Sequence, residues 1–134
     1  MRILLDTHVI LWTITGDNRI SEHICSMIGS SRNNIFFSLA SVWEVAIKNM
    51  SKPKVMPISD EYFIDDCLQS GFRMLPIEAK HILTVKTLSR SNNAPPHKDP
   101  FDRLLIAQAK AEEMTFVTHD KLLPYYDEPC ILYF

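Results

Sequence analysis

The sequence predicts an α/β domain in which helices cover both faces of a central, mostly parallel sheet. Short apolar runs alternate with segments of helical periodicity along much of the chain, and this alternation is typical of such sheets. A length of 134 residues favours one core over two, so we expect residues 1–134 to form a single domain. A hydrophobic content of 46% argues against disorder.

The first elements follow from local signals. An apolar run predicts a buried strand at residues 2–5, and the periodicity of residues 7–14 predicts a helix. Ser21 is followed by an acid and is typical of an N-cap, so a second helix is expected to begin there and to end near Gly29. The β-rich segment 35–38 predicts the second strand.

A longer helix is predicted at residues 39–50, because its apolar residues recur every three or four positions. Two prolines make residues 51–57 a loop. Ser59 then caps a helix that extends to about Ser70, and residues 72–75 predict a third strand. The predicted apolar face of the longer helix contains Leu39, Val42, Trp43, Ala46, Ile47 and Met50.

The last part of the chain repeats this alternation. Residues 78–88 predict a helix and residues 89–98, with two adjacent prolines, predict a loop. A helix is expected at about 100–113, a strand at 115–118, and an edge strand at 131–133.

Composition excludes several functional classes. The net charge of −2 argues against a strongly basic nucleic-acid wrapper, and no glycine-rich phosphate-binding motif is present. The three cysteines lack C-x-x-C spacing, so we expect neither disulfides nor structural zinc, and a reducing cytoplasm fits best. Asp6 and His8 interrupt the apolar start before it could span a bilayer, so no membrane association is expected.

Acidic residues occur where predicted strands end and helices begin. Asp6 directly follows the first strand, and Asp120 follows the strand at 115–118 after one intervening residue. Glu44 lies early in the long helix, and Asp99 and Asp102 open the helix that precedes the last inner strand. Ligands of open α/β sheets bind at the carboxyl ends of the strands, so we expect these five carboxylates to converge there.

Each acid also has a purely structural interpretation. Asp6 and Asp120 would serve as N-caps, and Asp99 with Asp102 would form an ordinary helix start around a proline. Glu44 has Lys48 four residues later, a spacing that suits an exposed ion pair.

The acids together predict a metal site, because a cluster of carboxylates repels itself unless a cation is bound. A set of oxygen ligands suits Mg²⁺ or Mn²⁺. The histidines do not favour zinc: His8 and His119 lie beside candidate acids, whereas His23, His81 and His97 are scattered without ligand spacing. Such a centre activates water for hydrolysis of a phosphodiester.

Four stretches of the chain resemble, in order, the signature segments of PIN-domain ribonucleases. They are Ile3-Leu4-Leu5-Asp6-Thr7-His8-Val9, residues 38–48 around Trp43-Glu44, residues 97–109 beginning His97-Lys-Asp-Pro-Phe-Asp, and Phe116-Val117-Thr118-His119-Asp120. The most similar subgroup is the toxin component of VapBC-type toxin–antitoxin pairs. The resemblance implies a three-layer α/β/α fold, Mg²⁺ or Mn²⁺, endonucleolytic cleavage of RNA, homodimers, and an antitoxin that blocks the site.

The same resemblance assigns roles to individual residues. Asp6, Glu44 and Asp120 match the family's metal-binding and catalytic acids, and the helix-opening acid matches Asp102 or Asp99. Thr7 and Thr118 match small polar residues that support those acids.

Basic residues near the acids are candidates for holding RNA, although a solvated charged face explains them equally well. The candidates are Lys48, Lys52, Lys54, Lys98 and Arg103. Arg103 has the alternative of pairing with a site acid. Trp12 and Trp43 lie on apolar helix faces and are predicted to be core residues rather than base-stacking platforms.

Two other functions remain open at this stage. A strand followed by Asp6 and Thr7 also suits an aspartyl-phosphate phosphotransferase, although His8 stands where a second acid is expected. The third possibility is a non-catalytic interaction module that keeps the fold and acts by binding a partner.

Overall fold

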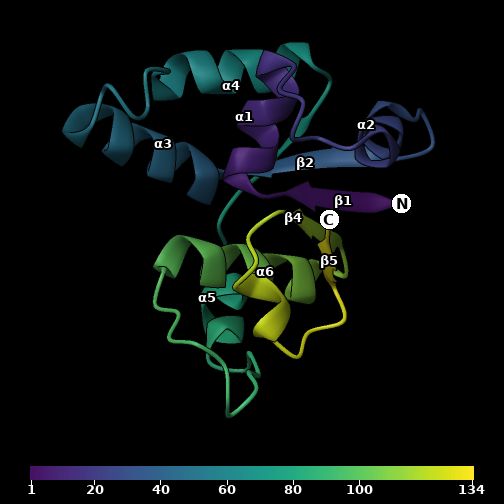
Figure 1. The fold of residues 1–134 in the computed structure, drawn as a ribbon, viewed down its shortest axis with the longest axis vertical. Coiled ribbons are helices and arrows are strands. Elements are labelled where there is room, and N and C mark those ends of the chain that lie inside the picture. Colours follow the sequence, from purple (N-terminus) through teal and green to yellow (C-terminus); the bar gives the residue numbers. More distant parts are fainter.

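Five parallel strands form the central sheet of the computed structural model, which describes residues 1–134 (Figure 1). The strand order is β3-β2-β1-β4-β5, so the first strand of the chain lies in the middle. The predicted parallel sheet is confirmed, including its last edge strand. The strands are β1 (Arg2–Leu5), β2 (Asn34–Ser38), β3 (Arg73–Leu75), β4 (Thr115–Thr118) and β5 (Ile131–Tyr133).

Six α-helices and one 3₁₀ turn connect the strands. They are α1 (Thr7–Thr15), α2 (Glu22–Gly29), α3 (Leu39–Ser51), α4 (Asp60–Gln69), α5 (Ala79–Val85), α6 (Pro100–Glu112) and the 3₁₀ turn η1 (Leu123–Tyr125). Ser21 and Ser59 cap α2 and α4 as predicted. Helix α5 is shorter than predicted, because the N–H groups of Thr87 and Leu88 donate to the carbonyls three residues earlier instead of continuing the α-helix. The turn η1 was not predicted.

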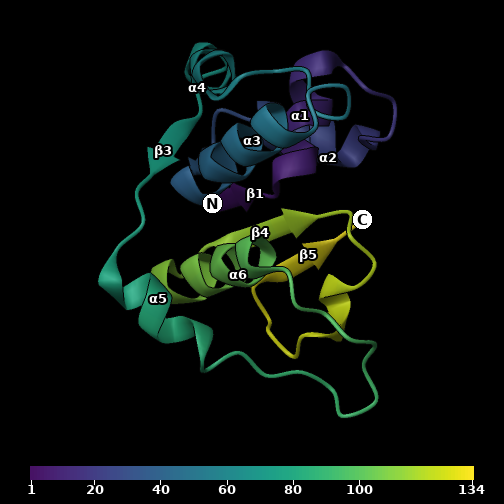
Figure 2. The same ribbon diagram turned by 90° about the vertical axis from the view of Figure 1, so that its left-hand side faces the viewer.

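The sheet separates two apolar cores because alternate side chains of a strand point to opposite faces. On one face, Ile3 and Leu5 pack with residues of α1, α2 and α4, and on the other face Leu4 packs with residues of α6 (Figures 1 and 2). Each fully buried apolar side chain of this size stabilises the fold by about 1.5–3 kcal/mol. Because helices cover both faces of the sheet, the predicted three-layer α/β/α architecture is confirmed.

The order of the strands places the carboxyl ends of β1 and β4 side by side at a switch in connectivity. After β1 the chain moves outward through β2 to β3, and it then returns past β1 to form β4 and β5 (Figure 2). Ligands bind at such switch points in doubly wound sheets. Asp6 and Asp120, which follow these two strands, lie at this position.

Helix α3 buries only part of the face predicted for it, including Val42, which packs against one core. Its buried residues are Ala40, Ser41, Glu44 and Val45. Trp43, Ile47 and Met50, which belong to the predicted apolar face, are 57%, 41% and 84% exposed. The prediction that Trp43 is a core residue is therefore wrong. The physical reason is that Glu44 faces an acidic pocket and Ser41 contacts Thr7 of α1, so the side of the helix that carries Trp43 is exposed. Trp12 is half-buried and packs against one core.

The helices are short, and none of them combines the length and the apolar character needed to cross a membrane.

Candidate metal centre

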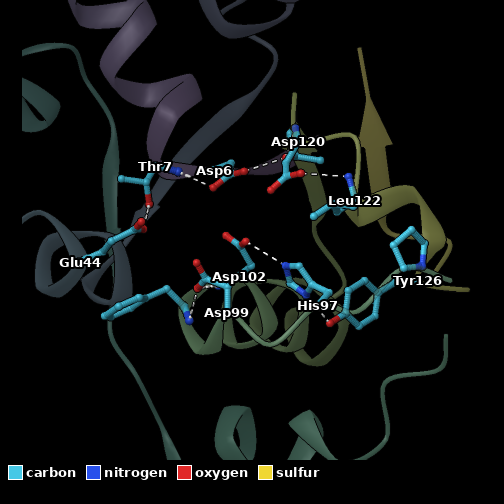
Figure 3. A network of polar contacts seen from close by, with 12 residues as sticks. Asp6, Thr7, Glu44, His97, Asp99, Asp102, Asp120, Leu122 and Tyr126 are labelled. Atoms are coloured by element: carbon cyan, nitrogen blue, oxygen red, sulfur yellow. Dashed lines mark hydrogen bonds and ion pairs between the residues drawn. The ribbon is translucent and has the colours of Figure 1, made fainter. Parts of the chain in front are cut away.

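A pocket of about 240 Å³ at the carboxyl ends of β1 and β4 is lined by all five acids singled out in the sequence. Asp6 and Asp120 lie on one side of an open space, Asp99 and Asp102 lie on the other, and Glu44 reaches in from α3 (Figure 3). The remaining lining residues are His8, Trp12, Lys48 and His119. Only one of these, Lys48, is a lysine or arginine, so the pocket is strongly acidic.

Asp6 is fixed by two hydrogen bonds that use both of its carboxylate oxygens. Its Oδ1 accepts from the backbone N–H of Thr7 at 2.7 Å, which makes Asp6 the N-cap of α1. Its Oδ2 accepts from the hydroxyl of Thr118 at 2.7 Å. The Thr118 hydroxyl reaches Asp6 because Leu5 pairs with Val117 in the β1–β4 register. The capping interpretation of Asp6 is thus correct, and the same carboxylate also lines the pocket.

Glu44 is held by contacts from α1 and from its own helix. The Thr7 hydroxyl donates to Glu44 Oε1 at 2.7 Å and lies 2.8 Å from the hydroxyl of Ser41. Lys48 Nζ donates to Glu44 Oε2 at 2.6 Å. The predicted ion pair therefore exists, but Glu44 is only 3% exposed, so it is not a surface pair. Thr7 and Thr118 each position one acid, as their proposed supporting role requires.

Asp99 and Asp102 differ in what their oxygens already contact. Asp99 Oδ1 accepts from the backbone N–H groups of Phe101 and Asp102, at 2.9 and 3.1 Å, and so caps α6. Asp102 makes no backbone hydrogen bond with its carboxylate, and its Oδ2 lies 3.1 Å from Nε2 of His97. Asp102 therefore has the carboxylate with fewer hydrogen bonds and is the more available of the two to bind a metal ion.

The sequence did not single out His97 as a site residue, because it has no ligand spacing along the chain. In the folded protein it lies beside two of the acids. The loop before α6 turns its ring onto Asp102, and the other ring nitrogen, Nδ1, lies 2.8 Å from the Tyr126 hydroxyl (Figure 3). One ligand atom each from His97, Asp102 and Asp120 lie within 4.8 Å of one another. The only sign in the sequence that His97 belongs to the site is its position just before the Asp99–Asp102 block.

Asp120 completes this side of the pocket from the turn after β4. Its Oδ1 accepts from the backbone N–H of Leu122 at 2.9 Å, and its own N–H donates to the Thr118 hydroxyl. It stabilises a turn and does not cap a helix, so the predicted N-cap role is wrong for this residue.

Burial and mutual repulsion disfavour the charged forms of two of the acids. Burial raises the pKa of Asp6 to about 6, against the hydrogen bonds from Thr118 and Thr7. Burial, followed by the charges of Asp6, Asp99 and other acids, raises the pKa of Asp102 to about 8. A bound divalent cation would relieve both effects, and the carboxylate oxygens are the donors that Mg²⁺ and Mn²⁺ prefer. The residues present therefore fit such an ion.

The candidate RNA-binding residues are divided by the fold. Lys48 lines the acidic pocket and also a larger adjoining hollow of about 670 Å³, which contains Lys52. Lys54 and Lys98 are exposed and line neither cavity. Arg103 forms no ion pair with a site acid and instead lines an apolar hollow beside Trp43.

A second group of ionisable side chains lies outside this pocket and is fully satisfied. His81 is buried, its Nδ1 accepts from the Glu78 N–H at 3.0 Å, and its Nε2 lies 2.9 Å from Glu112 Oε1. Lys80 pairs with the same Glu112 oxygen at 2.9 Å. These contacts explain the cluster as a structural link between α5 and α6.

Replacing Thr118 with valine is expected to weaken Mn²⁺ binding by about 10–100-fold, the usual effect of removing a partner that orients a metal-binding side chain. Valine keeps the shape of threonine but cannot donate to Asp6 Oδ2. Calorimetric titration with Mn²⁺ measures the change. The matched control is Thr13→Val, whose hydroxyl contacts only the Val9 carbonyl on α1. Equal Mn²⁺ affinity in both variants would contradict the positioning role of Thr118.

Comparison with known proteins gives one family and one type of fold. The family model described as PIN domain matches residues 3–129. Among solved structures, the chain is similar to a chain of the crystal structure of VapBC2 from Rickettsia felis bound to a DNA fragment from their promoter. That match has 19% sequence identity and a TM-score of 0.64, and it covers 100% of this chain and 98% of the other. No curated protein matches.

Proposed function

Because this chain belongs to the PIN-domain family, we propose that it is a metal-dependent endoribonuclease and the toxin of a toxin–antitoxin pair. The observation that carries the proposal is the convergence of five carboxylates on one pocket at the switch point of the sheet. The reaction is hydrolysis of an RNA phosphodiester by water, without a covalent nucleophile on the protein.

The pocket residues have distinct tasks in this reaction. Asp6, Glu44, Asp102 and Asp120 would hold Mg²⁺ or Mn²⁺, and Asp99 contributes through the oxygen that does not cap α6. When bound, the ion lowers the pKa of water and stabilises charge on the phosphate. Thr7 and Thr118 keep Glu44 and Asp6 in place.

Lys48 and Lys52 extend from the acids into the adjoining hollow and would contact phosphates of the RNA strand. Lys48 bridges the two regions, because its ammonium group contacts Glu44 and the residue also lines the hollow. The other three candidates lie outside both cavities, so any contact they make with RNA is away from the acids. They are Lys54, Lys98 and Arg103.

The test of this function is cleavage of structured RNA by the purified protein. Cleavage is expected with Mg²⁺ or Mn²⁺ and is expected to stop when chelator is in excess. Hydrolysis by water does not use the ribose 2′-hydroxyl, so a 2′-deoxy substitution at the scissile position should still be cut. Full activity in chelator would overturn the proposal.

The other two functions have less support. An aspartyl-phosphate enzyme is expected to have a second acid two residues after its nucleophile, and His8 stands at that position here. A stable fluoroberyllate adduct on Asp6 would favour it. An interaction module has no need of a metal, so the absence of any Mn²⁺-linked rise in melting temperature would favour that function.

The antitoxin is proposed to cover the hollow next to the acids. The hollow combines apolar residues, such as Leu11 and Ile58, with Arg19 and Lys52, so a partner segment with apolar and acidic side chains would fit it. The structural match to VapBC2 supports a toxin–antitoxin assignment. Co-expression with the product of a neighbouring reading frame should yield a stable complex in which RNA cleavage is blocked.

We also propose a homodimer formed through the exposed apolar stripe of α3. Trp43 contacts Phe101 edge-to-face, with ring centroids 5.1 Å apart, and Ile82 lies at the same apolar hollow. Exposed apolar residues that are grouped in this way are typical of interfaces. We expect Trp43→Glu to convert the dimer to a monomer, since it places a charge within the apolar contact.

Light scattering after size-exclusion chromatography measures this change. Tyr62→Glu is the control, because Tyr62 is an aromatic residue that is 69% exposed on α4, outside the stripe. A monomeric wild-type protein, or a dimer that survives Trp43→Glu, would contradict this interface.

A further inference from the structure

We propose that His97 is itself a ligand of the metal centre, so that the centre is a mixed nitrogen and oxygen site that prefers Mn²⁺ to Mg²⁺. The inference rests on the metal centre of the proposed function but not on RNA being its substrate. It assigns a residue outside the acidic set to the first coordination shell.

The spacing of three atoms supports this assignment. His97 Nε2 lies 3.1 Å from Asp102 Oδ2, and one ligand atom each of His97, Asp102 and Asp120 lie within 4.8 Å of one another. Ligands of one octahedral ion with bonds of about 2.1 Å are roughly 3.0 Å apart when adjacent and 4.2 Å apart when opposite. The three atoms therefore need only small side-chain adjustments to share an ion.

The ring of His97 is oriented as a ligand would be. Its side chain is only 4% exposed, so surrounding residues hold the ring in one orientation. Metal-bound histidines usually use their second nitrogen in a hydrogen bond that fixes the ring, and here Nδ1 lies 2.8 Å from the Tyr126 hydroxyl. In the tautomer with hydrogen on Nδ1, that nitrogen donates to Tyr126 and the lone pair of Nε2 faces Asp102 and Asp120.

Tyr126 is in turn held in place. Its ring stands at 88° to that of His97, and the guanidinium of Arg90 lies 5.0 Å from the centre of the Tyr126 ring. Tyr126 is 4% exposed, so the support behind His97 is buried. The imidazole thus has one defined direction, toward the acids.

A nitrogen ligand changes which ion the site prefers. Mg²⁺ is a hard ion that takes oxygen ligands and keeps several waters, so an imidazole adds little to its binding. Mn²⁺ stands first in the Irving–Williams order of divalent first-row metals, in which affinity for sites containing nitrogen increases toward Co²⁺ and Ni²⁺. We expect the order of affinity to be Co²⁺, then Mn²⁺, then Mg²⁺.

Pulsed electron paramagnetic resonance of Mn²⁺ bound to the wild-type protein tests the assignment directly. A directly bound imidazole nitrogen gives a hyperfine coupling, which must change when the protein is made with ¹⁵N-histidine. The coupling should disappear in His97→Asn and remain in His119→Asn, a histidine at the same pocket whose Nδ1 contacts the Phe134 carbonyl. The labelled wild type shows whether any histidine binds the ion, and the two variants show which histidine it is; retained Mn²⁺ binding in each variant shows that the variant is folded.

Calorimetric titration of the same proteins separates a ligand from a positioning residue. As a ligand, His97 should be required for tight binding of Mn²⁺ and Co²⁺, with a loss of about tenfold or more in His97→Asn and little change for Mg²⁺. Equal losses for all three ions, or no nitrogen coupling in the wild type, would overturn the inference. No binding of Mn²⁺ at all would overturn the metal centre itself. Nitrogen coupling in a protein that cuts no RNA would leave the inference standing and reject only the proposed substrate.

Discussion

Replacing Asp6 with asparagine is expected to lower metal-dependent RNA cleavage by more than about 100-fold while the protein remains folded. Loss of a residue that merely supports a ligand already costs about 10–100-fold, and Asp6 is proposed to be a ligand itself. The substitution removes the negative charge from the buried side chain between Thr7 and Thr118. Asparagine is as good an N-cap as aspartate, so α1 should keep its first turn.

The rate is measured on one RNA substrate with saturating Mn²⁺, and circular dichroism checks the fold. Asp65→Asn is the matched control, since Asp65 is exposed on α4 and lies outside the pocket. Cleavage by Asp6→Asn at a rate near that of Asp65→Asn would reject the role of Asp6.

Replacing Asp102 with asparagine is expected to stabilise the metal-free protein at pH 8 while abolishing cleavage. The folded protein raises the pKa of Asp102 from 3.8 to about 8, chiefly by burial. Between these pH values the folded state holds a proton that the unfolded state has lost, so the free energy of unfolding falls as pH rises. Asparagine is neutral throughout and avoids this loss, which we expect to be on the order of 5 kcal/mol at pH 8.

Thermal unfolding in chelator at pH 4 and pH 8 measures the effect. Wild type and Asp102→Asn should be similar at pH 4 and should diverge toward pH 8, whereas Asp65→Asn should follow the wild type. Asp6, with a pKa of about 6, adds a destabilisation of the same sign at lower pH. Mn²⁺ should reverse the order at pH 8 by stabilising only the wild type. Parallel pH dependence of wild type and Asp102→Asn between pH 4 and pH 8 without metal would contradict this role of Asp102.

The parts of the site that follow directly from strand ends were predictable from sequence. Asp6 and Asp120 are placed by β1 and β4, because parallel neighbours end at the same edge of a sheet. Thr118 is positioned by the same register, since it lies beside the residue that follows Leu5. Local capping signals also predicted where most helices begin.

The face of α3 was not predictable in the same way. Apolar periodicity locates an amphipathic helix, but it assumes that the apolar stripe faces the core of the same chain. Here Glu44 lines the pocket and Ser41 contacts Thr7 of α1, so Trp43 and Met50 are exposed. Periodicity alone does not distinguish an apolar stripe that packs in the core from one that a partner would cover, as in the proposed dimer.

The position of His97 at the pocket was not predictable for a different reason. It lies in an irregular loop whose path depends on Tyr126, which comes from the turn after β4. No spacing rule relates a residue before α6 to one in that turn. Long-range contacts of this kind appear only once the three layers are assembled.

The central claim is that the acidic pocket binds a divalent metal, and anomalous scattering from a crystal grown with Mn²⁺ tests it most directly. We expect an anomalous peak at the manganese edge inside the pocket, within bonding distance of Asp6, Asp102 or Asp120. A peak only outside this pocket, or none in a crystal of protein that cleaves RNA, would contradict the account.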